Sequence, residues 1–423
     1  MATIKLPYGK ETLEANILDS RLTAVLSSSL NEHPAQESES QIVRAAMNNP
    51  IASPSLRELS KNKEKIVIIA SDHTRPVPSK IIIPLMLEEI RCGNPDADIT
   101  ILIATGCHRA TSKDELADKF GSDIVSREKI VVHDCEDDDM LIDIGELPSG
   151  GRLVINKLAV EADLLCAEGF IEPHFFAGFS GGRKSVLPGI AGRQTVMYNH
   201  NSGFIADENS RTGILDNNAI HKDMIYAAGI ANLQFIVNVV LDENKNIAYA
   251  SAGDFNAAHL DGCRFLDNCC RAAAALSDIA ITTNGGYPLD QNIYQAVKCM
   301  TAAEKTVNKG GVIIAVSKCN DGHGGEGFYN TFRNEKDVDK LIRSFLETAP
   351  EDTIPDQWQS QIFARILKHA RVILVSDAPD DIVRALHMLP AHSVGEALAI
   401  ADDLLGYAGT VTVIPDGVST IVL

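Results

Sequence analysis

In the first half of the chain, short continuous runs of apolar residues alternate with segments of helical length. The segment Ile81–Ile90 has the length and the wide apolar face of a helix. Short runs rich in β-branched residues are typical of strands buried on both faces of a parallel sheet that helices cover. The predicted strands of this half are Lys65–Ala70, Ile99–Ala104, Lys129–His133, Ala162–Ala167 and Phe235–Leu241.

The second half repeats this alternation after an alanine-rich stretch near residues 268–276. We place a domain boundary there, which predicts an N-terminal cofactor-binding α/β domain over residues 1–270 and a C-terminal α/β domain over residues 271–423. Both are expected to hold mainly parallel sheets, and the cleft between them is the expected active site. The predicted elements of this half are strands Asp278–Thr282, Gly311–Val316, Arg371–Val375 and Val411–Ile414 and helices Gln357–His369 and Val394–Leu405.

The acidic balance of the chain narrows the partners that it can bind. Its 38 Lys and Arg residues against 57 Asp and Glu residues give a net charge of −19. That much negative charge repels nucleic acid and anionic membrane surfaces, so we expect neither as a partner. An anionic substrate would need a local cluster of Lys, Arg or His, so cationic residues near a candidate site are especially informative.

The cysteines and the N-terminus favour a cytoplasmic protein. The nine cysteines are odd in number and none forms a C-x-x-C pair, as expected for reduced thiols. Residues 1–9 lack a basic stretch followed by an apolar one, so no signal peptide is expected. The run Ile81–Leu87 is typical of the longest apolar runs and is too short to span a bilayer.

Loops rich in polar residues and glycine follow four of the predicted strands, at residues 71–76, 105–109, 168–185 and 283–291. In open α/β sheets, ligands bind at the carboxyl ends of strands, so we expect these loops to converge on one site. Three of the loops carry potential acid, base or cationic side chains. These candidates are Asp72, Arg75, His108, His174 and Lys184.

The loop from His174 to Ser185 carries the strongest chemical signal. Its glycines permit close approach of the backbone to a ligand, and its three phenylalanines suggest a dry pocket. A lysine in such surroundings, here Lys184, has a lowered pKa and is a candidate for covalent chemistry. Arg183 stands where a Walker A motif requires glycine, so nucleotide hydrolysis loses its main support.

Each candidate also has a purely structural interpretation. Asp72 can cap the turn after its strand and pair with Arg75, and His108 can be a loop histidine with satisfied hydrogen bonds. The sequence has no H-E-x-x-H motif and no close histidine or cysteine pair, so a local zinc site is not expected. Residues 71–76 contain no glycine, which argues against the dinucleotide fingerprint of an NAD-dependent dehydrogenase.

Six long motifs spread over both halves closely resemble the nickel-pincer lactate racemases. They occur in one consistent order and cover essentially the whole chain, which makes the resemblance highly specific. The motifs are S-D-H-T-R-P-V-P at 71–78, T-G-C-H-R at 105–109, H-F-F-A-G-F-S-G-G-R-K-S-V-L-P-G at 174–189, N-H at 199–200, N-G-G-Y-P-L-D-Q-N-I-Y-Q-A-V-K at 284–298 and I-P-D-Q-W at 354–358.

The resemblance implies a cofactor and the residues that hold it. The cofactor is the mononucleotide of pyridinium-3,5-bisthiocarboxylic acid, whose two sulfur-containing arms hold nickel in a pincer. Lys184 matches the lysine that binds this cofactor covalently through a thioamide, and His200 matches the protein ligand of the nickel. Proteins that synthesise the cofactor are the partners implied. Other matching cofactor contacts are Asp72, His73, Thr74, Arg75 and Trp358.

The resemblance also implies the acid/base and substrate residues. His108 and His174 match the two acid/base histidines of a lactate racemase. Arg75, Tyr294, Gln295 and Lys298 match residues that bind the 2-hydroxy acid substrate.

Elementary chemistry agrees with this expectation. A carboxylate stabilises a carbanion at the neighbouring carbon poorly, so racemising lactate by removing the C2 proton is difficult. Transfer of hydride from C2, while a base takes the hydroxyl proton, yields planar pyruvate instead. That route needs a cofactor, a base for each enantiomer, and cations for the carboxylate. Two alternatives stay open: a racemase or epimerase of another 2-hydroxy acid with the same cofactor, and a non-catalytic carrier of that cofactor.

Overall fold

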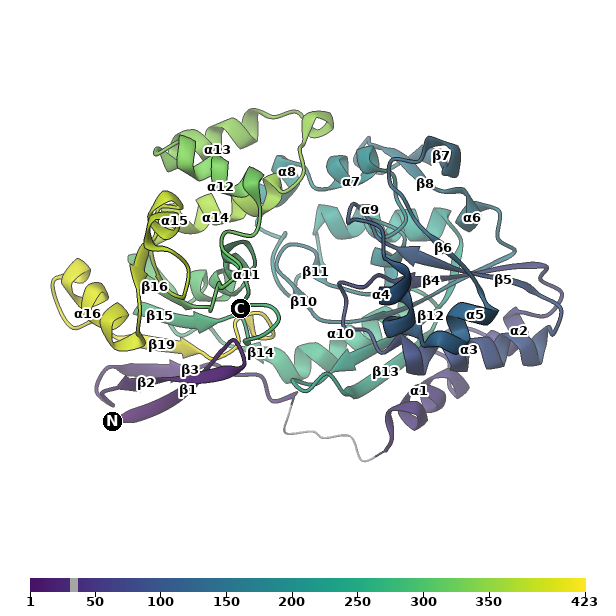
Figure 1. Ribbon diagram of the computed structural model, residues 1–423, viewed down its shortest axis with the longest axis horizontal. Coiled ribbons are helices and arrows are strands. Elements are labelled where there is room, and N and C mark those ends of the chain that lie inside the picture. The colour runs from purple at the N-terminus through teal and green to yellow at the C-terminus, as the bar shows by residue number, and fades with distance from the viewer. Residues whose placement is uncertain (31–36) are drawn as a thin grey trace.

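Two six-stranded sheets organise the chain, and each forms the centre of one lobe (Figure 1). The computed structural model describes residues 1–30 and 37–423. Both lobes carry helices around mainly parallel strands, so the predicted fold class is confirmed. Among the described residues, no helix has the length and the apolar character needed to cross a membrane.

The first sheet has the strand order β13-β12-β9-β4-β5-β6, and all neighbours are parallel except the pair β12 and β13. Every predicted strand of the first half is present, whereas the antiparallel edge strand β13 was missed. The strands are β4 (Lys65–Ser71), β5 (Asp98–Ala104), β6 (Lys129–Val132), β9 (Leu164–Phe170), β12 (Leu233–Leu241) and β13 (Ile247–Gly253).

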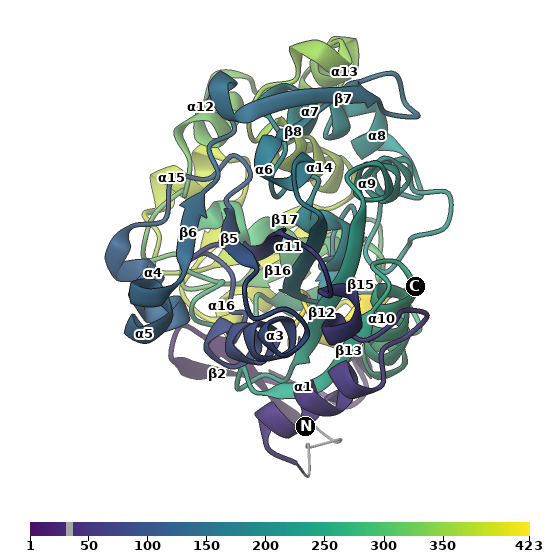
Figure 2. The same cartoon turned by 90° about the vertical axis from the view of Figure 1, so that its right-hand side faces the viewer.

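Both faces of this sheet are buried, which explains its continuous apolar runs. In β4, Ile66 and Ile68 pack toward α1 (Glu39–Asn48) and α3 (Ser79–Gly93), while Val67 and Ile69 belong to the core of the other face. That second face packs against α9 (Ala219–Ile230), as Figure 2 shows. The helices around this lobe also include α2 (Leu56–Leu59), α4 (Lys113–Phe120), α5 (Ser122–Arg127), α6 (Lys157–Val160), α7 (Arg193–Asn199) and α10 (Ala257–Cys270). The short helix α8 (Ser202–Ala206) packs instead against α13 (Val338–Glu347) and α14 (Gln357–His369) of the other lobe.

The second sheet is parallel throughout, in the order β18-β17-β16-β15-β19-β3. Two helices predicted here, α14 and α16, have the bounds expected from the sequence. The strands are β3 (Leu22–Val25), β15 (Ser277–Thr283), β16 (Val307–Val316), β17 (Arg371–Val375), β18 (Leu389–Ala391) and β19 (Val411–Ile414). The helices are α11 (Ile293–Glu304), α12 (Glu326–Asn334), α13 (Val338–Glu347), α14 (Gln357–His369), α15 (Asp380–Ala385) and α16 (Val394–Leu405).

The N-terminal segment lies with the second lobe rather than the first. The hairpin of β1 (Ala2–Tyr8) and β2 (Glu11–Ile17) shares a core with β15 and β16, and β3 pairs with β19 (Figure 1). The boundary between residues 270 and 271 stays a prediction. We propose one refinement, that residues 1–25 be grouped with the C-terminal domain.

Short elements complete the fold around the lobes. The pairs β7 (Leu141–Glu146) with β8 (Arg152–Asn156) and β10 (Pro173–His174) with β11 (Gly178–Phe179) are antiparallel. The pair β14 (Arg271–Ala272) with β20 (Ile421–Val422) is parallel and brings the C-terminus beside the start of the second lobe. Short 3₁₀ turns lie at Asp138–Met140, Gly182–Ser185 and Pro350–Asp352.

Candidate active site

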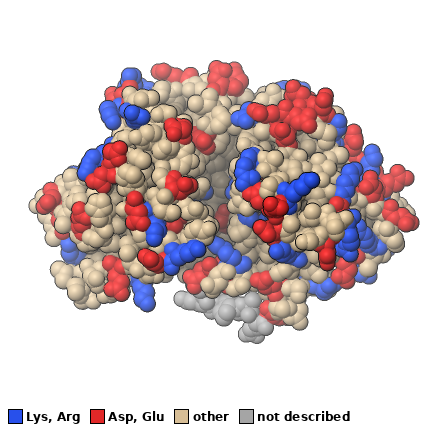
Figure 3. All heavy atoms as spheres, in the orientation of Figure 1, with Lys and Arg blue, Asp and Glu red and all other residues tan. Residues whose placement is uncertain are grey.

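A cavity of about 480 Å³ lies between the lobes, where the surface is visibly hollowed (Figure 3). Its walls come from the carboxyl ends of β4, β5 and β9 and from α11 and α14 of the other lobe. The sequence-predicted residues that line it are Asp72, Arg75, His108, His174, Lys184, His200, Tyr294, Gln295, Lys298 and Trp358. His73 and Thr74 are not among the lining residues.

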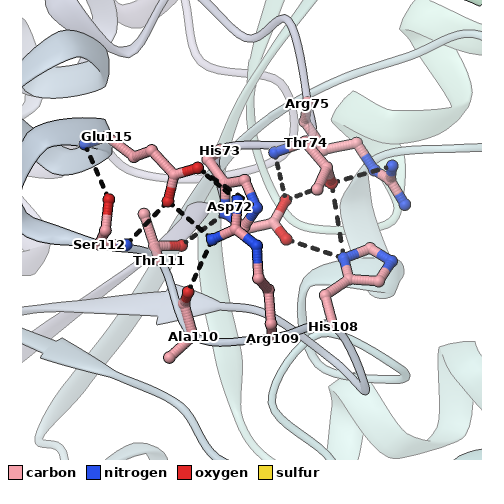
Figure 4. A network of polar contacts seen from close by, with 10 residues as sticks. All are labelled: Asp72, His73, Thr74, Arg75, His108, Arg109, Ala110, Thr111, Ser112 and Glu115. Carbon is pink, nitrogen blue, oxygen red and sulfur yellow. Dashed lines mark hydrogen bonds and ion pairs between the residues drawn. The ribbon is translucent and has the colours of Figure 1, made fainter.

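Asp72 and His108 form a hydrogen-bonded pair at one side of the cavity (Figure 4). They meet because β4 and β5 are parallel neighbours that end at the same edge of the sheet. Oδ2 of Asp72 lies 2.8 Å from Nδ1 of His108, while Thr74 donates to Oδ1 from its backbone N and its Oγ1 at 3.2 and 2.6 Å. With Nδ1–H donating to the carboxylate, Nε2 of His108 is left with a lone pair that can accept a proton.

Burial opposes the charge of Asp72, whose side chain is only 1% exposed. The hydrogen bonds from His108 and Thr74 outweigh that effect, so the pKa of the carboxyl group lies below its ordinary value. Asp72 is therefore a fixed negative charge beside His108, whose side chain is 44% exposed.

His73 belongs to an outer network on the far side of the same loop (Figure 4). Its Nδ1 lies 3.0 Å from Oγ1 of Thr111, and its Nε2 lies 3.8 Å from Glu115, which also forms two hydrogen bonds with Arg109. These contacts anchor the loop that carries Asp72 and Arg75. A cofactor contact for His73 stays a prediction.

His174 and Lys184 meet at another part of the cavity, 3.1 Å apart between Nε2 and Nζ. The backbone N–H of Ala177 donates to Nδ1 of His174 at 3.3 Å, so the proton of the neutral ring lies on Nε2. Nε2–H then donates to Nζ, which requires Lys184 to be an uncharged amine. This protonation state is the one a nucleophilic lysine needs.

The surroundings of this pair favour the uncharged forms. Burial lowers the pKa of Lys184 well below its ordinary value, and the charges of Arg183 and Arg75 lower it further. Burial also lowers the pKa of His174 well below its ordinary value, and the charges of Lys298 and Arg75 add to the effect. The aromatic ring of Phe176 packs against His174 with the ring centroids 4.5 Å apart.

Glycine shapes the turn that presents Lys184. Gly181 has a φ of +76°, and a Cβ there would lie 2.8 Å from the carbonyl oxygen of Phe170. A larger residue would push this turn away from the strand end, because L side chains are strained at that φ and the neighbouring atom is backbone. Gly181 thus allows the loop to pack on its own strand. The predicted close approach of this backbone to a ligand stays a prediction.

His200 presents one ring nitrogen to the cavity. It follows the last residue of α7, and its Nδ1 donates to the carbonyl oxygen of Val196 at 2.9 Å, which leaves the lone pair of Nε2 free to bind a metal. Burial lowers the pKa of His200 to about 3, so the ring is neutral, as a metal ligand must be. Phe176 and Trp358 hold the ring at centroid distances of 5.2 and 4.9 Å.

The second lobe contributes polar and cationic groups from α11 and α14. Tyr294 donates from its hydroxyl to Asp356 at 2.7 Å, and Gln359 donates to the carbonyl oxygen of Tyr294. Oε1 of Gln295 and Oε1 of Gln359 are buried, and no hydrogen-bond donor reaches either of them within the described part of the chain. Burial, followed by the charge of Arg75, lowers the pKa of Lys298 to about 8.

The residues present fit the expected nickel-pincer cofactor. Lys184 is a buried uncharged amine, His200 offers one imidazole nitrogen, and the amide oxygens of Gln295 and Gln359 are available to a bound group. Across residues 1–30 and 37–423, no three His, Cys, Asp or Glu side chains are grouped so that they could hold a metal ion. The sulfur arms of the pincer would supply further ligands to a metal bound by His200.

Sequence reasoning missed several residues that line this cavity, among them Glu168, Asp356 and Gln359. Glu168 was assigned to a loop, but it lies inside β9 and is 2% exposed. Asp356 is part of the quoted I-P-D-Q-W motif and Gln359 directly follows it, so the motif was the available signal for both residues. Their contacts with Tyr294 depend on the approach of α14 to α11, which local sequence does not reveal.

Comparisons with known proteins indicate the same family for both parts of the chain. Residues 8–213 match the family model of the lactate racemase N-terminal domain, and residues 272–422 match that of the lactate racemase C-terminal domain. The chain is 53% identical to the lactate racemase of Thermoanaerobacterium thermosaccharolyticum, over 100% of this chain and 99% of that protein. It is also 53% identical to the lactate racemase of Lactiplantibacillus plantarum, over 100% of both chains.

Solved structures extend the comparison to the fold. The structure of the lactate racemase apoprotein from T. thermosaccharolyticum matches with a TM-score of 0.97 and 52% identity, covering 100% of each chain. A protein from Thermotoga maritima matches with a TM-score of 0.66 and 18% identity, covering 91% of this chain and 98% of that one. At that identity, the second match shows a shared fold alone.

Proposed function

Because the chain belongs to the lactate racemase family and is therefore an isomerase, we propose that it interconverts D- and L-lactate through pyruvate by hydride transfer. The observation that carries the proposal is the convergence of His108, His174, Lys184 and His200 on one cavity. A non-catalytic carrier would need Lys184 and His200 but has no use for two histidines placed to move protons.

The cavity supplies cations for the substrate carboxylate in an otherwise acidic protein. Arg75 and Lys298 line it together, and each lowers the pKa of His174, which indicates that their charges act on the same space. A carboxylate held between a guanidinium and an ammonium group is oriented as well as attracted. We propose that Tyr294 and Gln295, on the first turn of α11, complete this substrate contact.

The two histidines would exchange protons with the lactate hydroxyl. Nε2 of His108 has the free lone pair of a base, and the carboxylate of Asp72 stabilises the imidazolium that forms. Nε2 of His174 is engaged by Lys184 in the structure. Conversion of that amine to a thioamide would leave a nitrogen that cannot take up a proton, so a protonated His174 would not face a lysine ammonium group.

Lys184 and His200 would hold the cofactor, with Trp358 beside His200 and the segment from Asp72 to Arg75 around it. When bound, the nickel-pincer pyridinium mononucleotide supplies a hydride acceptor, which no protein side chain offers. The protein keeps water from the reacting atoms through the buried rings of Phe176 and its neighbours. We further propose that cofactor-synthesis proteins deliver the group to Lys184 in the cytoplasm.

The experiment that tests the proposal is intact-protein mass measurement combined with nickel analysis on chain produced together with the cofactor-synthesis proteins. We expect a mass increase located at Lys184, stoichiometric nickel, and racemisation of lactate. Lys184→Ala should abolish the adduct, whereas Lys305→Ala, at a lysine on the far end of α11, should retain it. His200→Ala should keep the organic adduct and lose nickel. An active Lys184→Ala variant with full nickel content would overturn the proposal.

A further inference from the structure

Glu168 is a buried carboxylate with one oxygen bonded to the protein and the other without a protein partner. It lies near the end of β9 and is 2% exposed. Oε1 accepts hydrogen bonds from the backbone N and the hydroxyl of Ser71 at 3.0 and 2.9 Å and from the hydroxyl of Ser79 at 3.0 Å. Three donors on one oxygen fix the side chain in a single orientation.

The second oxygen, Oε2, has different surroundings. Of the residues that the structure describes, none places a hydrogen-bond donor within reach of Oε2. Glu168 also lines the cavity between the lobes. A buried carboxylate oxygen without a donor costs free energy, so a ligand that fills the cavity gains by supplying one. The lone pairs of Oε2 call for an O–H or N–H group.

The charges around the cavity limit which part of a ligand can lie against Glu168. Anionic parts of a ligand are drawn to Arg75 and Lys298 and are repelled by a carboxylate. The part that suits Glu168 is therefore uncharged and carries donors, as the hydroxyls of a sugar do. An acidic residue at the carboxyl ends of parallel strands is a common acceptor for the ribose of a bound nucleotide.

We propose that Oε2 of Glu168 accepts a hydrogen bond from a ribose hydroxyl of the pyridinium mononucleotide. This inference rests on the proposed function, because it takes the cofactor to be a nucleotide that occupies this cavity. It assigns Glu168 to nucleotide binding and not to proton transfer, which the proposed function gives to His108 and His174. Ser71 and Ser79 act as positioning residues, because they donate to Oε1 and so orient the carboxylate.

The test uses the full chain produced without cofactor and a probe that has the pyridinium ring and ribose phosphate but no sulfur arms, nicotinate mononucleotide. Ligand-observed NMR titration gives its dissociation constant, alongside those of its 2′-deoxy and 3′-deoxy analogues. Against the unaltered chain, one deoxy analogue should bind about tenfold more weakly, which corresponds to a loss of about 1.4 kcal/mol. This comparison requires no mutation and so no assumption about folding of a variant.

Glu168→Gln tests the same contact from the protein side. The amide keeps the shape and can still accept from the serines, but it removes the charge, so the parent mononucleotide should bind roughly five- to tenfold more weakly. The same deoxy analogue should lose little further affinity in this variant. Ser79→Ala is the matched control: it removes a donor to Oε1, leaves Oε2 in place, and should keep the preference for the ribose hydroxyl.

The outcomes separate this inference from the proposed function. If the mononucleotide binds but neither deoxy analogue binds more weakly, the assignment of Glu168 is wrong while the cofactor proposal stands. The same conclusion follows if Glu168→Gln weakens the parent and both analogues equally. If the unaltered chain does not bind the mononucleotide at all, both the inference and the proposed cofactor fail.

Discussion

The two histidines of the cavity have opposite electrostatic surroundings. His108 is hydrogen-bonded to the carboxylate of Asp72 and is half-exposed, whereas His174 faces Lys184 and lies near Lys298 and Arg75. A carboxylate partner stabilises an imidazolium, and neighbouring cations destabilise it. A racemase needs a base for each enantiomer, and its two directions are chemically equivalent. The two histidines of this cavity nevertheless have unequal surroundings.

Covalent attachment of the cofactor would reduce this asymmetry. The neutral Lys184 amine occupies Nε2 of His174 in the structure, at 3.1 Å. Once the amine has become a thioamide nitrogen, it can no longer gain a proton and repel the imidazolium. Under the proposed function, the fold alone would prepare His108, through Asp72, while His174 would depend on the chemistry at Lys184.

The largest effect should come from removing either histidine. We expect His108→Ala and His174→Ala each to lower the rate about 10²- to 10⁴-fold in both directions, because each ring must serve as base for one enantiomer and acid for the other. Chiral chromatography, starting from D-lactate and from L-lactate, measures both rates. His392→Ala, at an exposed histidine paired with Asp380, is the control. Full activity of either active-site variant in one direction would contradict the claim that each histidine serves as base for one enantiomer and acid for the other.

A smaller effect is expected from removing the charge of Asp72, the carboxylate that is hydrogen-bonded to His108. Asp72→Asn should lower the rate about 10- to 10²-fold with unchanged nickel and adduct, since the amide no longer fixes the ring tautomer. Glu115→Gln alters the outer network alone and should keep most of the activity. Loss of cofactor in Asp72→Asn would mean that Asp72 holds the cofactor and not the histidine.

The same substitution has a consequence for stability. The pKa of Asp72 is lower in the fold than in the unfolded chain, so its carboxylate stabilises the fold above the unfolded pKa. That contribution is lost as the pH falls through the folded pKa. Urea unfolding of Asp72→Asn should therefore show a deficit of about 1–3 kcal/mol at neutral pH that shrinks in acid. A deficit that grows in acid would contradict this sign.

The smallest effect concerns the cationic side of the cavity. Burial and Arg75 lower the pKa of Lys298 to about 8, so its ammonium form, which attracts lactate, disappears above that pH. We expect kcat/KM to fall about tenfold per pH unit in the alkaline range. Lys298→Arg keeps its charge there and should shift this fall to higher pH. An identical alkaline fall in both proteins would assign it to another group.

Much of the fold could be predicted because the parallel strands are buried on both faces. A continuous apolar run such as Ile99–Ala104 suits a strand that is covered on both faces, so strand β5 was found with nearly correct bounds. The pairing of β3 with β19 could not be predicted, because Leu22–Val25 is short and only partly buried. Its place in the second sheet depends on long-range packing of the N-terminal hairpin.

The candidate site likewise has a part that could be predicted from the sequence and a part that could not. Residues at strand ends, such as Asp72 and His108, could be brought together from topology alone, because parallel strands deliver their loops to one edge. The contact of Lys184 with His174 and the burial of Glu168 could not be predicted, since both depend on how one loop folds back on its strand. The resemblance supplied roles for residues, but not the unequal surroundings of the two histidines.

Fate of the C2 hydrogen tests the central claim, hydride transfer, most directly. Lactate carrying deuterium at C2 should racemise more slowly than unlabelled lactate, and the deuterium should remain largely in the product, because a hydride is shielded from solvent. Mass spectrometry of both enantiomers after partial conversion in ordinary water measures retention. The account predicts retained label together with the slower rate. Complete washout of the label into water, with both histidines intact, would contradict it and show proton abstraction by His108 and His174 instead.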